Sequence, residues 1–556
     1  MTGRTTSPES PRLWVSFVGA GPGDPGLLTL RALELLQGAD IVVTEGAEHA
    51  ALVRTALGLP EPRVVVDAEG NETLEYDGGP EFVDGGFGDD GQPLTHANRA
   101  KVVVKAAKTK RNVVRLMNGD PFLYASGPEE AMACVKAGIG FEIVPGVSSA
   151  TAVPAYAGIP LTTKSNREVT VLSAGDKVDW TAYADNRTLV LLSAVSTIAE
   201  TAAALIEAGR SPQTPVAMTS LGTTTAQTTL TSTLAGIAAD ARAAHVAPPA
   251  VTVVGEVVDV RETLSWFETK PLFGWRVLVP RTKEQAGSLS SRLRGYGSVP
   301  EEVPTISVEP PRNPQQMDKA VRGLVEGRYE WVAFTSVNAV KAVREKFEEY
   351  GLDARAFSGL KIAAVGDKTA ASLLDWGLRA DLTPSGEQSA AGLLADWPEY
   401  DELLDPINRV FLPRADIATE NLIAGLIDLG WECDDVTAYR TVRAAPPAAE
   451  TRDAIKSGKF DAVVFTSSST VRNLVGIAGK PHPSTIIAVI GPATAKTAEE
   501  HGLRVDVLAS APSVEVLVDA LADFGASRRA ALIESGQPVT KPSDRKPSAR
   551  RKSSQG

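Results

Sequence analysis

The chain contains a glycine-dense turn directly after a run of strand-forming residues. Residues 14–18 read as a buried strand, and they lead into Gly19-Ala20-Gly21-Pro22-Gly23-Asp24 before a helix that begins near Leu27. Because glycine lacks a side chain, such a turn exposes backbone N–H groups to an anionic or adenosine-bearing cofactor. The spacing departs from a G-x-G-x-x-G fingerprint, and the Lys-Ser/Thr of a P-loop is missing. The alternative is a tight turn that serves packing alone.

Two further polar loops follow strand-like runs in the same half of the chain. Asn118-Gly119-Asp120 follows residues 112–116, and Ser148-Ser149-Ala150-Thr151 comes shortly after residues 141–144. The three loops together predict one ligand site supported by α/β structure.

The C-terminal half is one α/β unit used twice. Residues 276–281 are repeated by 409–414 at an offset of 133 (409 minus 276), and residues 332–336 are echoed by 463–467. Each copy reads as short strand runs followed by amphipathic stretches, which is typical of parallel strands with crossover helices. The repeat therefore predicts two lobes with strand-to-helix turns that face a cleft.

Composition excludes several classes of protein. A chain of 556 residues has room for three or four domain-sized cores, and its net charge of −12 argues against general nucleic-acid binding. The two cysteines lie in different halves and the five histidines are scattered, so we expect neither a disulfide framework nor a metal site. No signal peptide or membrane helix is expected, which predicts a cytoplasmic protein.

The loops at Gly19, Asn118 and Ser148 closely resemble those of the tetrapyrrole methyltransferase family, specifically uroporphyrinogen-III C-methyltransferase. The resemblance covers about residues 13–268. It implies two α/β subdomains, a homodimer, and S-adenosylmethionine as the cofactor, with Glu129 as a candidate catalytic residue. The implied cofactor-binding residues are Gly19, Gly21, Pro22, Gly23, Asp24, Asn118, Gly119, Asp120, Ser148, Ser149 and Thr151.

Departures from the family pattern fall mainly on the substrate side. Ser126 stands where the family has an arginine that engages the substrate, Ser193-Ala194 replaces Met-Gly, and Thr44-Glu45 replaces Tyr-Asp. Serine cannot replace a fixed cation against a carboxylate-rich macrocycle. We therefore expect S-adenosylmethionine to bind and methyl transfer to be weak, and a silent binding or scaffold module is the alternative.

Residues 275–522 resemble uroporphyrinogen-III synthase through motifs such as Phe334-Thr335-Ser336 and Ala438-Tyr439-Arg440. The resemblance implies a two-lobed fold that cyclises hydroxymethylbilane, a linear tetrapyrrole with eight carboxylates, without a cofactor. Hydroxyls and backbone N–H groups at helix N-termini, together with basic side chains, would bind such a substrate. The candidate substrate-binding residues are Arg281, Thr335, Ser336, Lys368, Arg414, Ser467, Ser468, Ser469 and Thr494. Ordinary helix capping is the alternative for the Ser/Thr runs.

Tyr439 is the candidate catalytic residue of this half. Its repeat partner is Ile306 (439 minus 306 is again 133), so a purely structural role would accept an aliphatic side chain there. The resemblance implies that the tyrosine assists departure of the substrate hydroxyl as a hydrogen-bond donor or general acid. The alternative is a tyrosine packed in the hinge between the lobes.

These patterns predict a fused α/β enzyme of porphyrin, siroheme and cobalamin biosynthesis that binds small tetrapyrroles and no membrane. We expect a flexible N-terminus, a methyltransferase-like domain, a linker, a synthase-like domain and a basic disordered tail. The second domain splits into lobe 1 (275–304 plus 441–524) and lobe 2 (305–440). The five segments are 1–12, 13–268, 269–274, 275–524 and 525–556. A weaker alternative takes the two-lobed half as a small-ligand binding protein.

Overall fold

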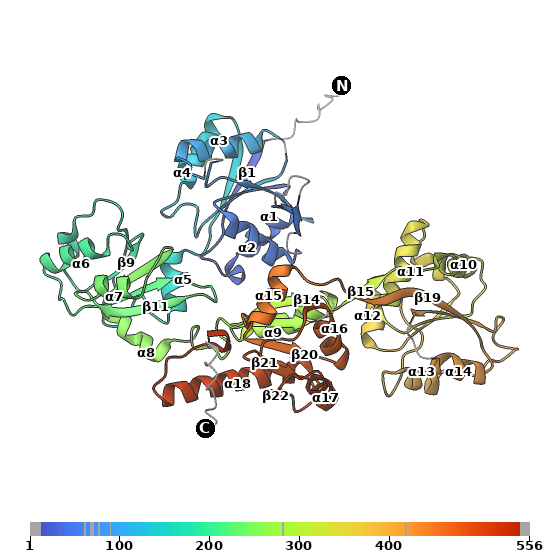
Figure 1. Cartoon of the computed structure of the whole chain (residues 1–556). Helices are drawn as coiled ribbons and strands as arrows, with labels where there is room; N and C mark the ends of the chain where they lie inside the picture. The colour runs from blue at the N-terminus through green and yellow to red at the C-terminus, as the bar shows by residue number, and fades with distance from the viewer. Residues whose placement is uncertain are drawn as a thin grey trace, which may run out of the picture. The chain divides into compact units, whose positions relative to one another are not determined.

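The chain divides into two compact units in the computed structural model (Figure 1). The first comprises residues 1–274 with 296–298, and the second comprises 275–295 with 299–556. Each unit is described by itself. The structure describes residues 13–59, 63–66, 72–75, 78–88, 91–109, 111–280, 283–416 and 420–544.

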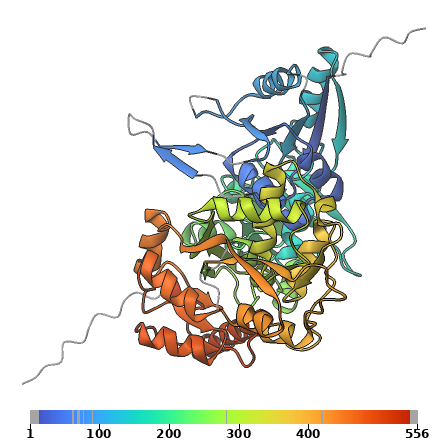
Figure 2. The same ribbon diagram turned by 90° about the vertical axis from the view of Figure 1, so that its right-hand side faces the viewer.

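The first unit begins with a sheet of five parallel strands in the order β5-β2-β6-β1-β7. The residues of the central strands β1 and β6 are almost all buried and, apart from Ser16 and Arg115, mostly apolar, as expected of a sheet that is covered on both faces. The strands are β1 (Trp14–Gly19), β2 (Ile41–Thr44), β5 (Glu81–Asp84), β6 (Val113–Met117) and β7 (Gly140–Val144). A separate antiparallel hairpin of β3 (Arg63–Val66) and β4 (Glu72–Glu75) projects from this unit in Figure 2.

Helices cover both faces of this sheet. The first pair, α1 (Leu30–Gln37) and α2 (Ala47–Leu57), packs with Val18 and Val42 on one face. The second pair, α3 (His96–Ala107) and α4 (Gly127–Lys136), packs with the opposite face. This arrangement leaves the carboxyl ends of the strands, with their glycine loops, at one edge of the sheet.

A second sheet of mixed direction follows, in the order β11-β10-β12-β9-β8. Its strands are β8 (Val169–Ser173), β9 (Thr188–Leu192), β10 (Pro215–Ser220), β11 (Thr228–Thr233) and β12 (Ala250–Val254). The associated helices are α5 (Ser149–Tyr156), α6 (Ile198–Glu207), α7 (Ile237–Ala243) and α8 (Arg261–Leu264), with the 3₁₀ turns η2 (Trp180–Tyr183) and η3 (Glu256–Val260). A further 3₁₀ turn, η1 (Pro25–Leu27), follows β1 of the first sheet. The residues expected to form a linker, 269–274, are packed, because Leu272 is fully buried.

Lobe 1 of the second unit is a parallel sheet in the order β14-β13-β20-β21-β22. Its strands are β13 (Arg276–Pro280), β14 (Val299–Val303), β20 (Ala462–Phe465), β21 (Ile486–Val489) and β22 (Val507–Leu508). Its helices are α9 (Lys283–Gly295), α15 (Ala449–Ser457), α16 (Ser468–Ala478), α17 (Pro492–Glu500) and α18 (Val514–Glu534).

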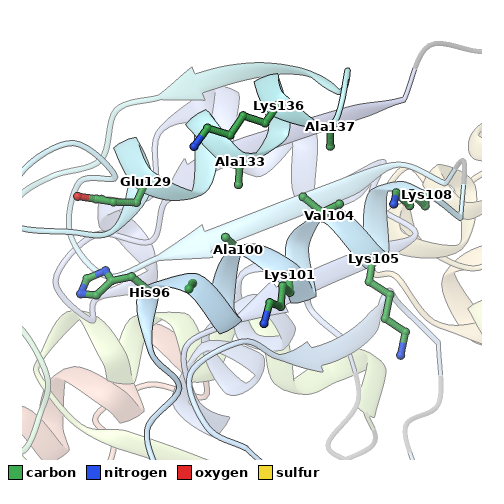
Figure 3. A pocket seen from close by; sticks show the side chains of 11 residues that line it. His96, Ala100, Lys101, Val104, Lys105, Lys108, Glu129, Ala133, Lys136 and Ala137 are labelled. Carbon is green, nitrogen blue, oxygen red and sulfur yellow. The ribbon is translucent and has the colours of Figure 1, made fainter.

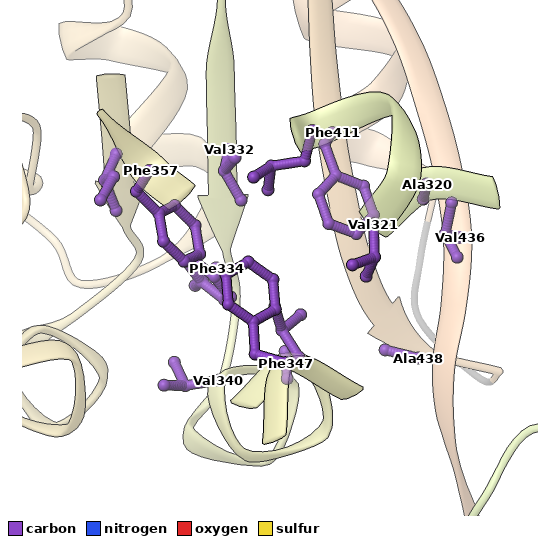
Figure 4. Packing of buried hydrophobic residues seen from close by; sticks show 14 of the residues in the cluster. Ala320, Val321, Val332, Phe334, Val340, Phe347, Phe357, Phe411, Val436 and Ala438 are labelled. Carbon is purple, nitrogen blue, oxygen red and sulfur yellow. The ribbon is translucent and has the colours of Figure 1, made fainter. Parts of the chain in front are cut away.

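Lobe 2 has the sheet order β15-β19-β18-β16-β17 around an aromatic core (Figure 4). In that core Phe347 stacks on Phe357 with ring centroids 5.0 Å apart. The strands are β15 (Ile306–Glu309), β16 (Trp331–Phe334), β17 (Lys361–Ala364), β18 (Arg409–Ala415) and β19 (Glu432–Arg443). The helices are α10 (Pro314–Val325), α11 (Val337–Glu349), η4 (Ala354–Phe357), α12 (Asp367–Asp375), α13 (Ala390–Asp396) and α14 (Asn421–Asp428).

The sequence repeat corresponds to a repeat of hydrogen bonds. The Asp461 N–H donates to the carbonyl of Arg276 in lobe 1, and the Glu330 N–H donates to the carbonyl of Arg409 in lobe 2, both over 2.9 Å. The segment that follows β14 and the end of β19 are extended, because β15 pairs antiparallel with the end of β19. The predicted α/β class with an internally duplicated second half is confirmed.

The expected disordered tail from residue 525 is wrong for its first part. Helix α18 continues to Glu534, because Gly525 is buried within it and helix-favouring residues follow. The chain then returns, with Pro542 buried in the turn η5 (Pro542–Asp544) and the Ser543 N–H donating to Asp461 Oδ1 over 2.9 Å. Packing against lobe 1 thus outweighs the polar composition. Residues 545–556, and the expected flexible segment 1–12, lie outside the described residues.

Candidate functional site

Three glycines bring the predicted cofactor loops together at the carboxyl edge of the first sheet. A Cβ atom on Gly19 would lie 2.4 Å from Gly146 Cα and 2.5 Å from the Gly119 carbonyl oxygen. A Cβ on Gly146 would lie 2.0 Å from that same oxygen. Any side chain at Gly19 or Gly146 would therefore push the ends of β1, β6 and β7 apart.

Hydrogen bonds fix the first two loops to each other. The Gly21 N–H donates to the Gly119 carbonyl over 3.3 Å, and the Gly119 N–H donates to the Gly21 carbonyl over 3.0 Å. Both glycines have positive φ, 71° and 60°. Asp120 accepts the Gly146 N–H at Oδ2 over 3.0 Å, which ties the third loop to the second.

Asp24 connects the first loop to more distant parts of the unit. Its Oδ1 accepts the Gly26 N–H over 2.8 Å, and the Tyr156 hydroxyl donates to its Oδ2 over 2.8 Å. Burial, followed by the contact with Asp24, raises the pKa of Tyr156, so this hydroxyl stays a donor. The Asp24 N–H donates to Thr223 Oγ1 over 3.1 Å, in the loop after β10. The sequence did not single out Tyr156 or Thr223, since both lie over 100 residues away.

Backbone strain is concentrated in loops that follow strands of this unit. Tyr124, Ser193, Leu221 and Thr223 all have positive φ between 48° and 67°. Non-glycine residues rarely adopt such angles, and they do so most often at functional sites. Ser193, one of the departures from the family pattern, thus occupies a strained turn directly after β9.

The third loop serves helix α5 as well as the predicted site. Ser148 is the N-cap residue and its hydroxyl accepts the Ala150 N–H over 3.2 Å, while Thr151 Oγ1 donates to the Ser148 carbonyl over 3.1 Å. Ser149 is the first residue of the helix. In the first loop, the predicted cofactor-binding residues Pro22 and Gly23 are partly exposed. Ser148 thus caps α5, and the remaining N–H groups of the first turn can still bind a ligand.

Asn118 is held by a buried histidine. His49 is 2% exposed, and its Nδ1 accepts the Glu45 N–H over 3.3 Å. Because a backbone N–H can only donate, Nδ1 is the acceptor and the proton of the neutral ring resides on Nε2. The Nε2–H then donates to Asn118 Oδ1 over 2.8 Å. This contact turns the Asn118 amide nitrogen away from His49, a residue that the sequence did not indicate.

Two departures from the family pattern meet on one fully buried arginine. Arg115 Nε donates to Glu130 Oε2 over 2.7 Å, and its Nη2 lies 3.4 Å from Glu45 Oε1. The Ser126 hydroxyl donates to Glu130 Oε1 over 2.7 Å, and Ser126 itself is 3% exposed. Ser126 therefore completes a buried ion pair. Glu129, the predicted catalytic carboxylate, is exposed and lines a groove between α3 and α4.

In lobe 2, Tyr439 bonds to the N-cap of a helix. Its hydroxyl lies 3.0 Å from Ser336 Oγ, and Ser336 caps α11 by accepting the Ala339 N–H over 3.2 Å. Tyr439 is 8% exposed and its ring packs in the core of the lobe. A cavity of about 380 Å³ beside it is also lined by Asn338 and Lys341. Tyr439 is therefore packed, as the alternative required, and it also borders an open cavity.

The matching turn of lobe 1 holds the serine cluster. Ser467 caps α16 in a capping box with Thr470, and its Oγ lies 2.9 Å from Ser469 Oγ. Ser468 donates to the Ala493 carbonyl over 3.0 Å. Thr494, predicted to bind substrate, is 4% exposed within α17. The hydroxyls of this turn are largely engaged by the protein itself.

The predicted basic partners of the substrate differ in their surroundings. Arg414 donates from Nε and Nη2 to the two carboxylate oxygens of Asp435, so a substrate carboxylate would compete with that residue. Lys368 is exposed at the start of α12, and Thr335 is partly exposed beside Ser336. Arg281 lies outside the described residues. Their substrate roles stay predictions.

Comparison with known proteins assigns each half of the chain. The family of tetrapyrrole (corrin/porphyrin) methylases matches residues 15–238, and the uroporphyrinogen-III synthase HemD family matches residues 287–519. The porphyrin biosynthesis protein HemD of Ruminiclostridium josui is 30% identical over 524 residues, which cover 92% of this chain and 98% of that protein. The chain belongs to the family of this HemD protein. The predicted fusion is confirmed, and we call its parts the methylase and synthase domains.

Other relatives match one domain. The S-adenosyl-L-methionine-dependent uroporphyrinogen III methyltransferase of Methanosarcina barkeri is 36% identical over 259 residues, 45% of this chain and 94% of that protein. Siroheme synthase 1 of Yersinia enterocolitica is 39% identical over 268 residues, and the chain spans about half of its length (51%). Among solved structures, the uroporphyrin-III C-methyltransferase of Thermus thermophilus complexed with S-adenosyl homocysteine is 28% identical, covering 44% of this chain and 99% of that one at a TM-score of 0.35. Within the described residues, no helix is both long enough and apolar enough to cross a membrane.

Proposed function

We propose that the synthase domain cyclises hydroxymethylbilane to uroporphyrinogen III and that the methylase domain methylates this product at C2 and C7 to give precorrin-2. The observation that carries the proposal is the match to a HemD protein over 92% of the chain, across both domains. One chain would then perform two consecutive steps on the same macrocycle.

Ring closure requires that the terminal hydroxyl group leaves as water, after which ring D rearranges through a spiro intermediate. Tyr439 is the proton donor we assign to that departure, since the residue lines the cavity and its hydroxyl contacts Ser336. A tyrosine is a weak acid at neutral pH, so hydrogen bonding to the departing oxygen is its main contribution.

S-adenosylmethionine fits the glycine cradle of the methylase domain. Glycine at positions 19 and 146 lets the three loops meet at the carboxyl edge of the first sheet, because a Cβ atom at either position would collide with the backbone of a neighbouring loop. The backbone N–H groups of these loops that stay unpaired are the donors proposed for the cofactor. When bound, this cofactor supplies an electrophilic methyl group. The residues that would hold it are Gly19, Gly21, Pro22, Gly23, Asp24, Asn118, Gly119, Asp120, Ser148, Ser149 and Thr151. Asp24 and Asp120 hold the loops in shape, and His49 orients Asn118.

The comparisons do not favour a silent methylase module, and the structure supplies a physical reason to expect activity. The expectation of weak methyl transfer treated Ser126 as the loss of a cation. Ser126 instead satisfies Glu130, whose other contacts neutralise Arg115. An arginine at position 126 would bring a second guanidinium into the buried surroundings of Arg115, which costs stability rather than restoring activity.

The deciding experiment supplies the full chain with hydroxymethylbilane, with and without S-adenosylmethionine. We expect the type III isomer in both cases and precorrin-2 only with the cofactor. Recovery of the type I isomer alone, which forms spontaneously, would overturn the synthase assignment. Type III product without methylation would mean that the methylase domain is a silent binding or scaffold module. Ser126→Arg should not raise methylation, and a clear increase would show that serine is the limiting defect.

The resemblance also motivates a homodimer through the methylase domain and a cytoplasmic location. Sedimentation of the purified chain tests the first, and cell fractionation tests the second.

A further inference from the structure

A groove lies between α3 and α4, and none of its lining residues belongs to the glycine loops (Figure 3). Its volume is about 820 Å³, within the usual range of ligand pockets, roughly 300–1,000 Å³. The floor consists of small apolar residues such as Ala100, Val104 and Ala133. Because these side chains are short, the two helices leave an open hollow along their length.

The rim of this groove is basic in an otherwise acidic protein. Lys101, Lys105 and Lys108 recur along one side of α3 at positions i, i+4 and i+7, and Lys136 extends from α4. Glu129 is the one carboxylate among the lining residues, whereas the whole chain carries a net charge of −12. The groove is therefore a local attractor for anions on a surface that repels them elsewhere.

The ammonium groups of these lysines are available for a ligand. Among the residues that the structure describes, none of the four forms an ion pair, and Lys101 Nζ donates to Asn98 Oδ1 over 3.1 Å. By contrast, Lys346 and Lys361 each lie 3.0 Å from a carboxylate oxygen.

The spacing of the cations indicates the kind of anion. At 1.5 Å of rise per residue, Lys101 and Lys108 are separated by about 10 Å along the helix. Cations spread over that length suit a ligand with several anionic groups better than a single phosphate or carboxylate. A ligand with an apolar body and several carboxylates around its rim can contact the floor with its body and the lysines with its charges.

We propose that this groove is a second tetrapyrrole-binding site, which captures carboxylate-rich macrocycles outside the methylation site. The proposal assigns Glu129, which lines the groove, to this second site and not to methyl transfer. The inference rests on the proposed function for the identity of the ligand, because uroporphyrinogen III has an apolar macrocycle and eight carboxylates. Its role is to retain the product of the synthase domain on the methylase domain. A ligand held there by exposed ion pairs binds weakly and is released readily.

The test uses the full chain and uroporphyrin, the fluorescent oxidised octacarboxylate. The variant Lys105→Gln/Lys108→Gln/Lys136→Gln is compared with Lys319→Gln/Lys456→Gln/Lys459→Gln, which removes the same charge from exposed lysines elsewhere. Equilibrium dialysis at low and high salt gives the affinity and the number of sites. We expect the groove variant to lose one salt-sensitive site or to weaken it by about tenfold, taking a few-fold per exposed ion pair.

A second measurement locates the ligand directly. Carbodiimide activates the porphyrin carboxylates, and attack by a lysine amine then forms an amide bond to the porphyrin as the activated oxygen leaves with the urea by-product. We expect labelled peptides that contain Lys105, Lys108 or Lys136. Unchanged dialysis in the groove variant, or labelling there no stronger than at the control lysines, would overturn the inference. Synthase turnover should be the same in both triple variants.

The two proposals fail in different ways. If the enzyme is active but its groove variant binds uroporphyrin normally, the proposed function stands and the inference about the groove fails. If the chain binds uroporphyrin through the groove lysines but produces no type III isomer, the inference about the groove stands and the synthase assignment fails.

Discussion

The two lobes of the synthase domain place a serine at the same turn and use it differently. In lobe 1, Ser467 forms a capping box with Thr470, so the helix engages both side chains. In lobe 2 the residue equivalent to Thr470 is Ala339 (470 minus 131), and Ser336 contacts the Tyr439 hydroxyl over 3.0 Å. Lobe 2 thus has an alanine in place of the capping partner and also has the contact with Tyr439, a residue whose repeat partner is Ile306. The duplicated turn is common to both lobes, and divergence at two positions gives lobe 2 a contact between serine and tyrosine that lobe 1 lacks.

The largest effect expected from this comparison is that of Tyr439→Phe. Loss of the hydroxyl should lower synthase turnover by about ten- to a thousand-fold, toward the lower end of the usual general-acid contribution of roughly 10²–10⁴-fold, because a tyrosine is a weak acid. Stability should fall by only about 0.5–1.5 kcal/mol, the net contribution of one hydrogen bond. Initial rates of type III isomer formation, with urea unfolding alongside, provide the measurement. Unchanged turnover would assign Tyr439 to packing and make the two lobes chemically equivalent.

A matched pair of capping variants sharpens the comparison. Ser336→Ala and Ser467→Ala should each destabilise the domain by about 0.5–2 kcal/mol, since each removes an N-cap. Only Ser336→Ala should also slow turnover, by roughly two- to tenfold, because it removes one hydrogen bond that orients Tyr439. Equal turnover losses in the two variants would mean that the lobe 1 turn also takes part in the reaction.

The lobes also differ at Asp461 and its repeat partner Glu330. Asp461 accepts the Arg276 N–H over 2.8 Å and the Ser543 N–H over 2.9 Å, whereas Glu330 contacts Lys361 Nζ. Burial raises the pKa of Asp461. The folded state then binds the proton more tightly than the unfolded state, whose aspartate pKa is about 3.9.

Asp461 should therefore make the free energy of unfolding of the C-terminal unit pH-dependent. Its contribution rises as pH falls through the folded pKa toward about 4, and it is lost as pH rises. Asp461→Asn should flatten this part of the profile, which urea unfolding between pH 4 and 7 measures. Parallel profiles for the two proteins would contradict the assignment.

The smallest effect concerns Cys433 in β19, beside the strand pairing that supports Tyr439. Burial raises the pKa of this thiol to about 11, so at pH 8 only on the order of one molecule in a thousand carries the thiolate. Alkylation by iodoacetamide should be slow in the native protein and equally slow in Tyr439→Phe. Fast labelling of the variant would show that lobe 2 has opened and that its lost turnover is structural.

Local patterns were sufficient to predict much of this protein. The glycine loops and the strand runs before them predicted the cofactor edge of the first sheet, because glycine after a buried strand is a local signal. The offset of 133 predicted that two lobes would share one design, and the observed pairing of Asp461 with Arg276 and of Glu330 with Arg409 follows that repeat. The order of motifs was enough to identify both families.

The use of individual side chains was decided by the tertiary structure. The sequence indicated that Ser126 lacks an expected cation, whereas in the structure Ser126 donates to Glu130, which pairs with the buried Arg115. The sequence predicted that Arg414 binds the substrate, whereas in the structure its guanidinium donates to Asp435, 21 residues later in the chain. Polar composition after Gly525 indicated a tail, although burial of Gly525 and Pro542 holds the chain on lobe 1.

The amino-acid sequence by itself determined the families, the fold class and the duplication, because these depend on periodicity and on motifs confined to a few neighbouring residues. Only the tertiary structure decided which polar groups remain available for a ligand. Burial and pairing join residues such as His49 and Asn118 that are far apart along the chain, and no local pattern records which distant group satisfies a donor or a charge.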